Sequence, residues 1–473
     1  MNDAVLNLVR GVRFPEYRRE HDSAGSSLRV LTGRLRQAYY DAAPMREDVY
    51  TTPFGGPIGD SIGPWPEFVL RGLPCQKSKQ GYCTPCFYSR MPQVSSSVEK
   101  VYESLIDQVA YILHNFDGLV VRNQFGPVAW PGRAARKPVA FVLTPTGSFF
   151  DKIEFPLHVR NRILEMLLDH SRRIDCPFAV YIETHAEHFL SASKHREFAK
   201  TTSLLKKLNA RVLFGYESSN PFVRNVLYNK SLKQQTFLTA VNRARDAGLG
   251  VGAFAFVGVS PLNDIEILCD AIETLGFLQS RRIAPVVMFP NVQPYTIQEL
   301  LFLYHALNLP EPRTILEVVR HLITALPDCD DGTMDPWLIA DPGGGPPSPK
   351  YTIFANRGAC VTCAECTRLI YRALVELRLT RDRRAFLTTD ELLSTCQCAT
   401  DYHELLRKQA GDTPALEQRM NRMIETVRDK VDDYVSVMRP ELNNLDNYAA
   451  FQDSVPRHGE PDEPAAQLKA GLL

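Results

Sequence analysis

The sequence predicts an α/β fold, a full or partial barrel of parallel strands surrounded by helices. The first observation is a series of near-continuous apolar runs, typical of strands that are buried on both faces of a parallel sheet. The second is that amphipathic stretches separate these runs, and repeated strand–helix units build parallel sheets with right-handed crossovers. In such barrels the chemistry lies at the carboxyl ends of the strands. The expected strands are 67–73, 139–143, 178–182, 211–214, 251–257 and 285–289.

Helical spacing of apolar residues fills the intervals between these strands, at about 98–113, 157–174, 193–208, 232–247 and 263–279. A helical N-terminal arm and a turn-rich linker are expected over 1–64, and the barrel over 65–340. A Pro- and Gly-rich break at 341–349 precedes a cysteine-rich metal module over 350–410. The pattern of 411–453 predicts an amphipathic helix docked on the body, and the polar tail 454–473 is expected to be disordered.

Composition limits the classes of partner. The chain has 473 residues, with 54 Lys and Arg against 54 Asp and Glu, so its formal net charge is zero. A protein built around a folded nucleic acid usually carries a basic surplus, so such a partner is possible but not favoured. No apolar run approaches the roughly 18 residues of a membrane span, and the start lacks a signal-peptide core. We expect a cytoplasmic protein without membrane contact and with reduced thiols.

Three cysteines follow the first expected strand with the spacing Cys-x7-Cys-x2-Cys. They are Cys75, Cys83 and Cys86, and the aromatic residue Phe87 comes directly after them. Three thiolates on one loop suit three irons of a 4Fe–4S cluster and leave the fourth iron open, whereas a structural zinc site wants four ligands. A zinc loop with a distant fourth ligand and three unrelated buried thiols are the alternatives.

A second group of cysteines lies in the C-terminal module. Its members are Cys360, Cys363, Cys366, Cys396 and Cys398, with His403 close enough in sequence to replace one of them as a ligand. The first three form a compact motif that predicts an auxiliary 4Fe–4S cluster, which is the preferred interpretation. A structural zinc site with four thiolates remains the alternative.

The three-cysteine loop after the first barrel strand resembles the radical S-adenosylmethionine (SAM) superfamily. The longer first gap departs from that family's commonest spacing, Cys-x3-Cys-x2-Cys. It resembles the branch with the Elongator catalytic subunit and the archaeosine-forming radical SAM proteins. Three further segments resemble motifs of that branch and occur in the same order at strand ends: Leu-Thr-Pro-Thr-Gly-Ser-Phe-Phe-Asp at 143–151, Tyr-Ile-Glu-Thr-His-Ala-Glu at 181–187 and Phe-Gly-Tyr-Glu-Ser-Ser-Asn at 214–220.

The resemblance implies that the open iron binds SAM and that one electron cleaves it to a 5′-deoxyadenosyl radical. This radical then abstracts hydrogen from the substrate. An external donor of the flavodoxin or ferredoxin type is implied as the electron source. The resemblance also implies a cofactor-binding set: Phe87, Thr146, Gly147, Ser148, Glu183, Glu217, Ser218 and Arg224. The alternatives are a plain loop at 146–148, a salt bridge to a neighbouring helix for each of the two glutamates, and a surface helix position without a role for Arg224. His185 and Glu187 are candidate substrate contacts, with structural polar roles as their alternative.

We therefore expect a radical SAM enzyme acting on a small molecule, such as a nucleoside or a specialised metabolite. If the C-terminal module holds an iron–sulfur cluster, sulfur insertion from that cluster is the sharpest hypothesis. A lyase that modifies a tRNA base, of the archaeosine type, is the first alternative. A non-catalytic scaffold that carries metal is the second.

Overall fold

The computed structural model describes most of the expected barrel and the C-terminal helices. The described residues are 3–42, 54–55, 67–86, 97–117, 119, 139–145, 147–290, 292–325, 338–339, 360–380 and 383–442. Phe87, Thr146, the linker at 341–349 and the tail after 442 lie outside them. Within the described part, no helix is both long and apolar enough to cross a membrane.

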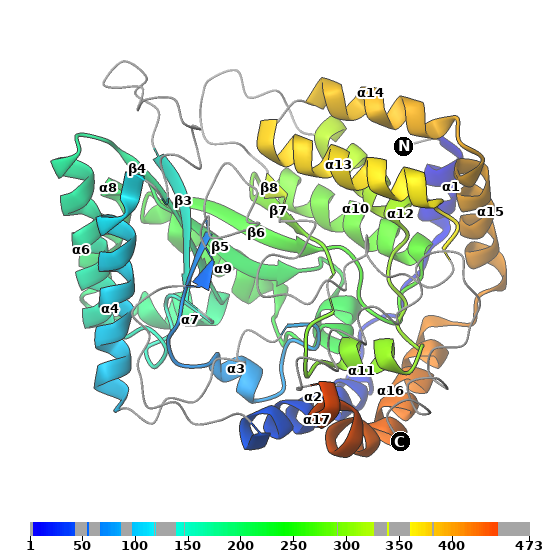
Figure 1. The fold of residues 1–473 in the computed structure, drawn as a ribbon, viewed down its shortest axis with the longest axis horizontal. Helices are drawn as coiled ribbons and strands as arrows, with labels where there is room; N and C mark the ends of the chain where they lie inside the picture. Colours follow the sequence, from blue (N-terminus) through cyan, green and yellow to red (C-terminus); the bar gives the residue numbers. More distant parts are fainter. Residues whose placement is uncertain are drawn as a thin grey trace.

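One sheet forms the centre of the fold (Figure 1), and the predicted fold class is confirmed. The described strands are ordered β1 to β8 across the sheet as they are along the chain, and all neighbours from β2 to β8 are parallel. The short β1 pairs antiparallel with β2. The strands are β1 Phe54–Gly55, β2 Glu67–Leu70, β3 Val139–Pro145, β4 Phe178–Thr184, β5 Arg211–Glu217, β6 Gly250–Phe256, β7 Ala284–Met288 and β8 Leu338–Ile339.

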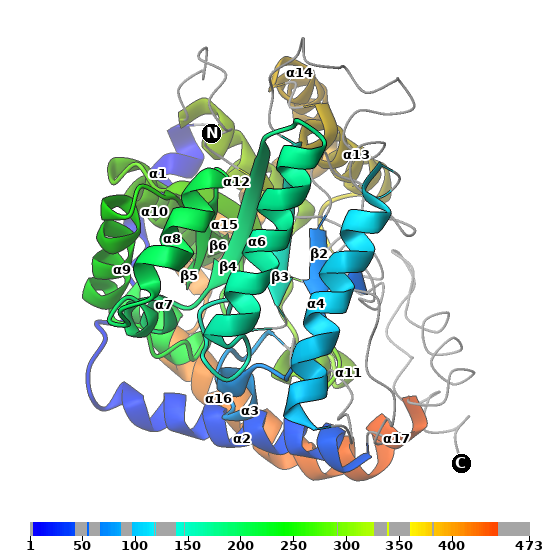
Figure 2. The same cartoon turned by 90° about the vertical axis from the view of Figure 1, so that its left-hand side faces the viewer.

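Helices cover the outer face of the sheet, as the amphipathic stretches predict (Figure 2). Alternate residues of a strand point to opposite faces, so Phe178, Val180 and Ile182 of β4 enter the large core beneath the helices. Tyr181 lies on the inner face, in a smaller apolar cluster that includes Leu213. The helices following the strands are α4 Val98–His114, α6 Leu157–Arg173, α7 Ala186–Ala192, α8 Phe198–Lys207, α9 Gln234–Asp246, α10 Asp264–Ser280, α11 Ile297–Leu303 and α12 Pro312–Ala325.

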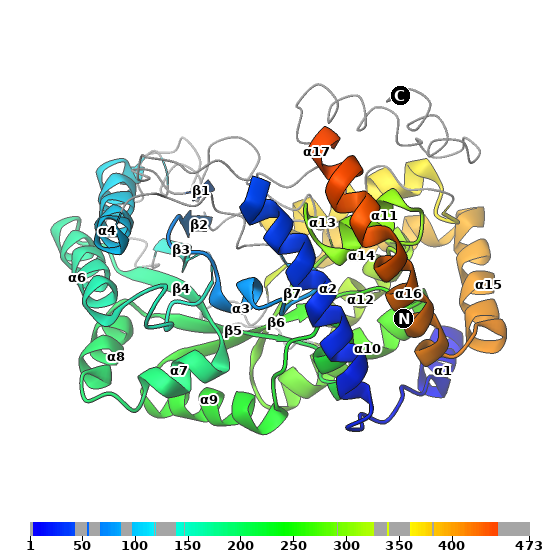
Figure 3. The same cartoon turned by 90° about the horizontal axis from the view of Figure 1, so that it is seen from below.

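The N-terminal arm and the C-terminal amphipathic helix lie side by side at one end of the barrel (Figure 3). Helix α1 runs Asp3–Gly11, α2 His21–Ala42 and α16 Leu416–Asp433, which η3 (Tyr434–Met438) and α17 (Arg439–Leu442) continue. The apolar stripe of α16 is buried from Leu416 to Val431. Helix α2 also contacts the π-helix η2, Val223–Leu227, after β5.

Three helices of the cysteine-rich region pack on the outer helices of the barrel. They are α13 Ala364–Thr380, α14 Arg383–Ser394 and α15 Gln397–Asp412. Helix α13 contacts α12, and α15 contacts α10 and α1. Because Cys366, Ile370 and Cys398 belong to the same buried core as the barrel helices, this region is joined to the barrel by apolar packing.

Candidate functional site

The three-cysteine loop leaves β2 at the carboxyl edge of the sheet. Cys75 caps the short helix α3 (Gln76–Lys79), and its carbonyl accepts the Lys79 N–H at 3.0 Å. The chain then reverses at Gly81, whose φ is +81°, where a Cβ atom would lie 2.2 Å from the Arg29 carbonyl oxygen. Cys83 also has a positive φ, 59°, which an ordinary residue adopts only where its surroundings impose it.

Arg36 of α2 supplies much of that constraint. Its guanidinium is fully buried and donates hydrogen bonds to four backbone carbonyls of the cysteine loop. The acceptors are Ser78, Tyr82 at 2.6 Å, Cys83 at 2.8 Å and Cys86 at 2.6 Å. The planar fork of arginine thus sets the path of the loop from α3 to the last cysteine.

The segment after η2 fixes the other side of the loop. The N–H of Thr84 donates to the Tyr228 carbonyl at 3.1 Å, and its hydroxyl donates to the Leu227 carbonyl at 2.6 Å. The Cys83 N–H donates to the Asn229 carbonyl at 3.3 Å, and the Asn229 side chain donates to the Gly81 carbonyl at 3.2 Å. The loop is therefore held as part of the barrel edge.

Glu154 connects the loop to the turn after β3. One carboxylate oxygen accepts the Gln76 N–H and the other accepts the Ser148 N–H, both at 2.7 Å. Gly147 makes this approach possible, because a Cβ atom there would lie 1.9 Å from the carboxylate. Burial raises the pKa of Glu154 to about 8 against the opposing effect of these hydrogen bonds.

Glu217 and Lys230 form a buried ion pair of 2.6 Å where β5 ends. Gly215 leaves room for it, since a Cβ atom there would meet the Lys230 amine at 2.5 Å. Burial alone lowers the pKa of Lys230, but the Glu217 carboxylate and the thiols of Cys83 and Cys86 outweigh it and raise that pKa. Lys230 is thus a fixed positive charge beside the cysteine loop.

Glu183 and Ser148 both form hydrogen bonds between the ends of β3 and β4. Glu183 lies on the inner face of β4, two residues after Tyr181, where one carboxylate oxygen accepts the Thr144 hydroxyl at 2.9 Å. Ser148 is fully buried; its hydroxyl shares a hydrogen bond with Thr184 at 2.7 Å and accepts the His185 N–H at 3.2 Å. Ser148 therefore joins the ends of β3 and β4.

Arg224 and Ser218 also make internal contacts. The Arg224 guanidinium is 1% exposed and donates to the carbonyls of Ser218 at 2.6 Å and Leu232 at 2.9 Å. The Ser218 hydroxyl donates to Asp270 of α10. Among the described residues, these contacts tie Arg224 and Ser218 to the loop after β5 and to α10.

The two candidate substrate contacts lie at the end of β4, next to the cysteine loop. Glu187 forms a 3.0 Å ion pair with Lys77 of α3. His185 is half-buried and faces the ring of His188, with 5.3 Å between ring centroids. Burial, followed by the charges of Lys230 and Lys77, lowers the pKa of His185 well below its usual value. His185 is therefore a neutral imidazole at pH 7.

The loop fits a 4Fe–4S cluster with three protein ligands. Its thiols lie beside two buried cations, Arg36 and Lys230, which offset the negative charge of a thiolate-bound cluster. Among the described residues, the three thiols are not close enough to one another to bind a single ion together. Such separation is expected of ligands that bind different irons.

Sequence reasoning missed Arg36, Glu154 and Lys77. A signal for Arg36 exists, because it falls on the buried stripe of α2 after Leu28, Leu31, Thr32 and Leu35, where a cation needs partners. Glu154 carries no comparable pattern, because its partners are backbone amides brought together by the fold.

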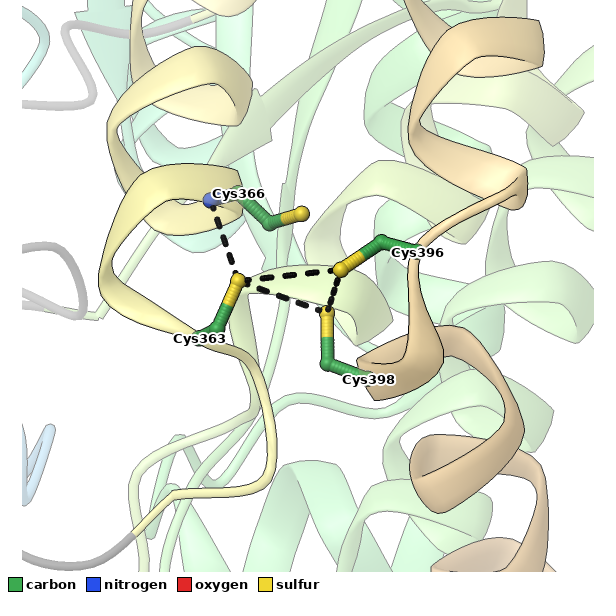
Figure 4. Close-up of side chains that lie close together, drawn as sticks. All are labelled: Cys363, Cys366, Cys396 and Cys398. Carbon is green, nitrogen blue, oxygen red and sulfur yellow. Dashed lines mark hydrogen bonds between the residues drawn. The ribbon is translucent and has the colours of Figure 1, made fainter.

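A second group of thiols joins α13 to α15 (Figure 4). The Sγ atoms of Cys363, Cys366, Cys396 and Cys398 all lie within 4.8 Å of one another, and we call these four residues the cysteine quartet. Cys360 is not a member. Its thiol donates to the Thr362 carbonyl at 3.0 Å, so the expected compact motif of 360, 363 and 366 is not the group that forms.

Comparison with known proteins gives distant relatives. No protein-family model matches the sequence. An uncharacterized protein of Methanocaldococcus jannaschii is 22% identical over 342 residues, which are 72% of this chain and 80% of that protein. Archaeosine synthase subunit beta of Methanosarcina acetivorans is 23% identical over 340 residues, which are 72% of this chain and 84% of the relative.

Among solved structures, the queuine lyase from Clostridium spiroforme bound to SAM and queuine overlaps 54% of this chain and 90% of its own. Its sequence identity is 17% and its TM-score 0.31, which is too low to define a shared fold. The chain is thus similar in sequence to archaeosine synthase subunit beta over most of the length of both proteins.

Proposed function

We propose that this protein is a radical SAM enzyme that cleaves SAM reductively and abstracts hydrogen from a small-molecule substrate. One observation carries the proposal. The three-cysteine loop is fastened at the carboxyl edge of the sheet from both sides, by Arg36 and by the segment after η2. Such anchoring holds the cysteines where the chemistry of a parallel barrel takes place.

Cys75, Cys83 and Cys86 would hold the cluster. A 4Fe–4S cluster with an open iron supplies the electron that cleaves SAM to the hydrogen-abstracting 5′-deoxyadenosyl radical. Glu183 and Glu217 end neighbouring strands on the inner face, where their carboxylates suit the ribose hydroxyls or the ammonium group of SAM. Gly147 and the Glu154 carboxylate keep the β3 turn against the loop. The internal contacts of Ser148, Ser218 and Arg224 favour positioning roles for them.

The substrate would lie next to His185 and Glu187. These residues follow β4 and adjoin the loop through the ion pair between Glu187 and Lys77. A neutral imidazole both donates and accepts hydrogen bonds, which suits the polar edge of a nucleoside or a similar metabolite. An external one-electron donor of the flavodoxin or ferredoxin class would complete the system.

The test is SAM cleavage by anaerobically reconstituted and reduced protein, followed as 5′-deoxyadenosine by chromatography. We expect wild type to form this product and each of the variants Cys75→Ala, Cys83→Ala and Cys86→Ala to form none. Cys269→Ala, a change of a buried cysteine on α10, is the matched control and should retain product formation. Wild-type rates in a triple-alanine variant would sink the proposal, and so would a wild type that never cleaves SAM, the outcome that a non-catalytic scaffold predicts.

A second candidate is a tRNA-base-modifying lyase. The similarity to archaeosine synthase subunit beta, across 84% of that protein, favours it. The formal net charge of zero argues against a nucleic acid as the main partner. Sulfur insertion requires a C-terminal iron–sulfur cluster, and it becomes the weaker alternative if the cysteine quartet binds a single metal ion.

A further inference from the structure

The thiols of the cysteine quartet lie closer together than ligands of separate irons would. The Sγ atom of Cys363 is 3.9 Å from that of Cys396 and 3.7 Å from that of Cys398, and the last two are 3.5 Å apart. Four thiolates bound to one zinc ion at about 2.3 Å in a tetrahedron are separated by about 3.8 Å. A cubane binds each thiolate through a different iron at its corners, which keeps the sulfurs farther apart. The spacing therefore matches one metal ion.

Two helix N-termini present these thiols. Cys363 directly precedes α13 and Cys366 lies in its first turn, while Cys396 is the N-cap residue of α15 and Cys398 lies in its first turn. The Cys366 N–H donates to the Cys363 sulfur at 3.5 Å. Free backbone N–H groups and the helix dipole both stabilise negative charge at these positions. The two helix N-termini would therefore stabilise the negative charge of metal-bound thiolates.

Arg313 of α12 completes the surroundings. Its guanidinium is 5% exposed and donates to the Cys398 sulfur at 3.0 Å and, more weakly, to the Cys366 sulfur at 3.7 Å. Four thiolates around a divalent ion carry a net charge of −2, and a buried cation offsets part of it. The same guanidinium nitrogen donates to the Leu393 carbonyl at 2.9 Å, and this contact orients the Arg313 side chain. An arginine placed in this way serves as an outer partner of the metal ligands.

The quartet also forms a closed set of ligands. Glu311 holds the chain just before it, by accepting the N–H and hydroxyl of Thr362 at 3.2 Å and 2.7 Å. The Thr362 carbonyl in turn accepts the Cys360 thiol at 3.0 Å, and Cys360 is not in the group of four converging thiols. Four protein ligands leave no open position for a substrate, which is the mark of a structural site.

We infer that the cysteine quartet binds one zinc ion in a closed tetrahedral site that clamps α13 and α15 to α12, with Arg313 as a positioning residue. The inference concerns the C-terminal region alone and does not depend on SAM cleavage at the barrel.

The test is the metal and sulfide content of the full-length protein, purified anaerobically without added zinc. We expect one zinc per chain, in addition to whatever iron the barrel holds. Replacing zinc with Co²⁺ should give the intense visible bands and sulfur-to-metal charge transfer of tetrahedral cobalt thiolate. Both readouts use the native chain, so they do not require a variant to fold.

Variants then assign the ligands. Cys363→Ser, at the exposed edge of the quartet, should lose the zinc, and Cys360→Ala should keep it. Arg313→Gln should lower the affinity for zinc by about 10- to 100-fold in competition with a chelator. Arg368→Gln, an exposed change on α13, should leave that affinity as in wild type.

Three results would overturn the inference. Four additional irons with matching sulfide would show a cluster at the quartet. A single iron without sulfide in wild type would show that the site is not a zinc site. Zinc retained in full by a variant lacking both Cys363 and Cys398 would place the ion elsewhere.

Discussion

A single arginine holds one side of the three-cysteine loop. Arg36 belongs to the N-terminal arm, about forty residues before the loop, and yet its guanidinium binds the loop's carbonyls in a fully buried position. Removing one partner of a buried charged network leaves the others unsatisfied, and this costs more than the hydrogen bonds themselves contribute. The arm is therefore part of the candidate site.

We predict that Arg36→Gln lowers both the stability of the protein and the iron content of the barrel. Glutamine cannot reach four carbonyls, so several would be left buried without a donor, at a cost of roughly 3 kcal/mol. Urea unfolding and iron analysis after anaerobic reconstitution measure the two effects. Arg34→Gln is the matched control on the same helix, because its half-exposed ion pair with Asp432 should contribute no more than about 1 kcal/mol. Arg36→Gln protein with wild-type iron and an unchanged urea midpoint would contradict this account.

The residue scale also shows what the sequence could and could not predict. The three cysteines and Glu217 could be found, because they stand in short ordered motifs at strand ends. Glu154 could not, because it accepts the backbone amides of Gln76 and Ser148, which are far apart in sequence and meet only in the fold. A sequence motif consists of side chains, whereas any residue type can supply a backbone amide, so such a partner cannot be predicted from a motif.

At the scale of elements, the strands were predictable and the thiol grouping was not. Apolar runs such as 178–182 and 251–257 locate β4 and β6 because burial on both faces demands near-continuous apolar sequence. The five C-terminal cysteines were read by spacing along the chain. The fold selects four of them by a different rule, the meeting of the first turns of α13 and α15, which leaves Cys360 outside.

The junction between the end of β5 and α10 predicts a specific dependence on pH. Asp270 is buried on α10 and accepts the Ser218 hydroxyl. Burial raises its pKa from 3.8 to about 7, against the opposing effect of that hydrogen bond. The folded state therefore keeps a proton that the unfolded state releases above pH 3.8. Because the folded state binds this proton more tightly, the contribution of Asp270 to the free energy of unfolding is complete below pH 3.8. It is lost as the pH rises through about 7.

Asp270→Asn should remove that loss, because the amide keeps an acceptor for Ser218 and never ionises. We expect the Tm of the variant relative to wild type to rise between pH 5 and pH 8. Asp246→Asn, an exposed change on α9, is the control and should follow wild type across this range. A constant Tm difference between Asp270→Asn and wild type would show that Asp270 does not ionise in this range.

On the scale of the whole molecule, a helix from the N-terminal arm packs against the C-terminal amphipathic helix. Helices α2 and α16 lie side by side, joined by contacts such as the 2.9 Å hydrogen bond between His21 and Glu417 (Figure 3). The same α2 carries Arg36, so the C-terminal helix supports the element that holds the cysteine loop.

The net charge of the whole molecule leads to a test that separates a small-molecule substrate from tRNA. With 54 basic and 54 acidic residues the formal net charge is zero, so the chain has no overall basic surplus to attract a polyphosphate backbone. We predict weak binding of bulk tRNA that falls steeply with salt and nearly vanishes at about 0.15 M, because released counterions supply such affinity. Fluorescence anisotropy of labelled tRNA over a salt series measures this, with a single-stranded homopolymer of equal length as the control.

Similar weak curves for both RNAs would support a small-molecule substrate. A tight complex with tRNA alone at physiological salt would put the tRNA-modifying lyase first, since base and shape contacts would then carry the affinity that net charge cannot supply.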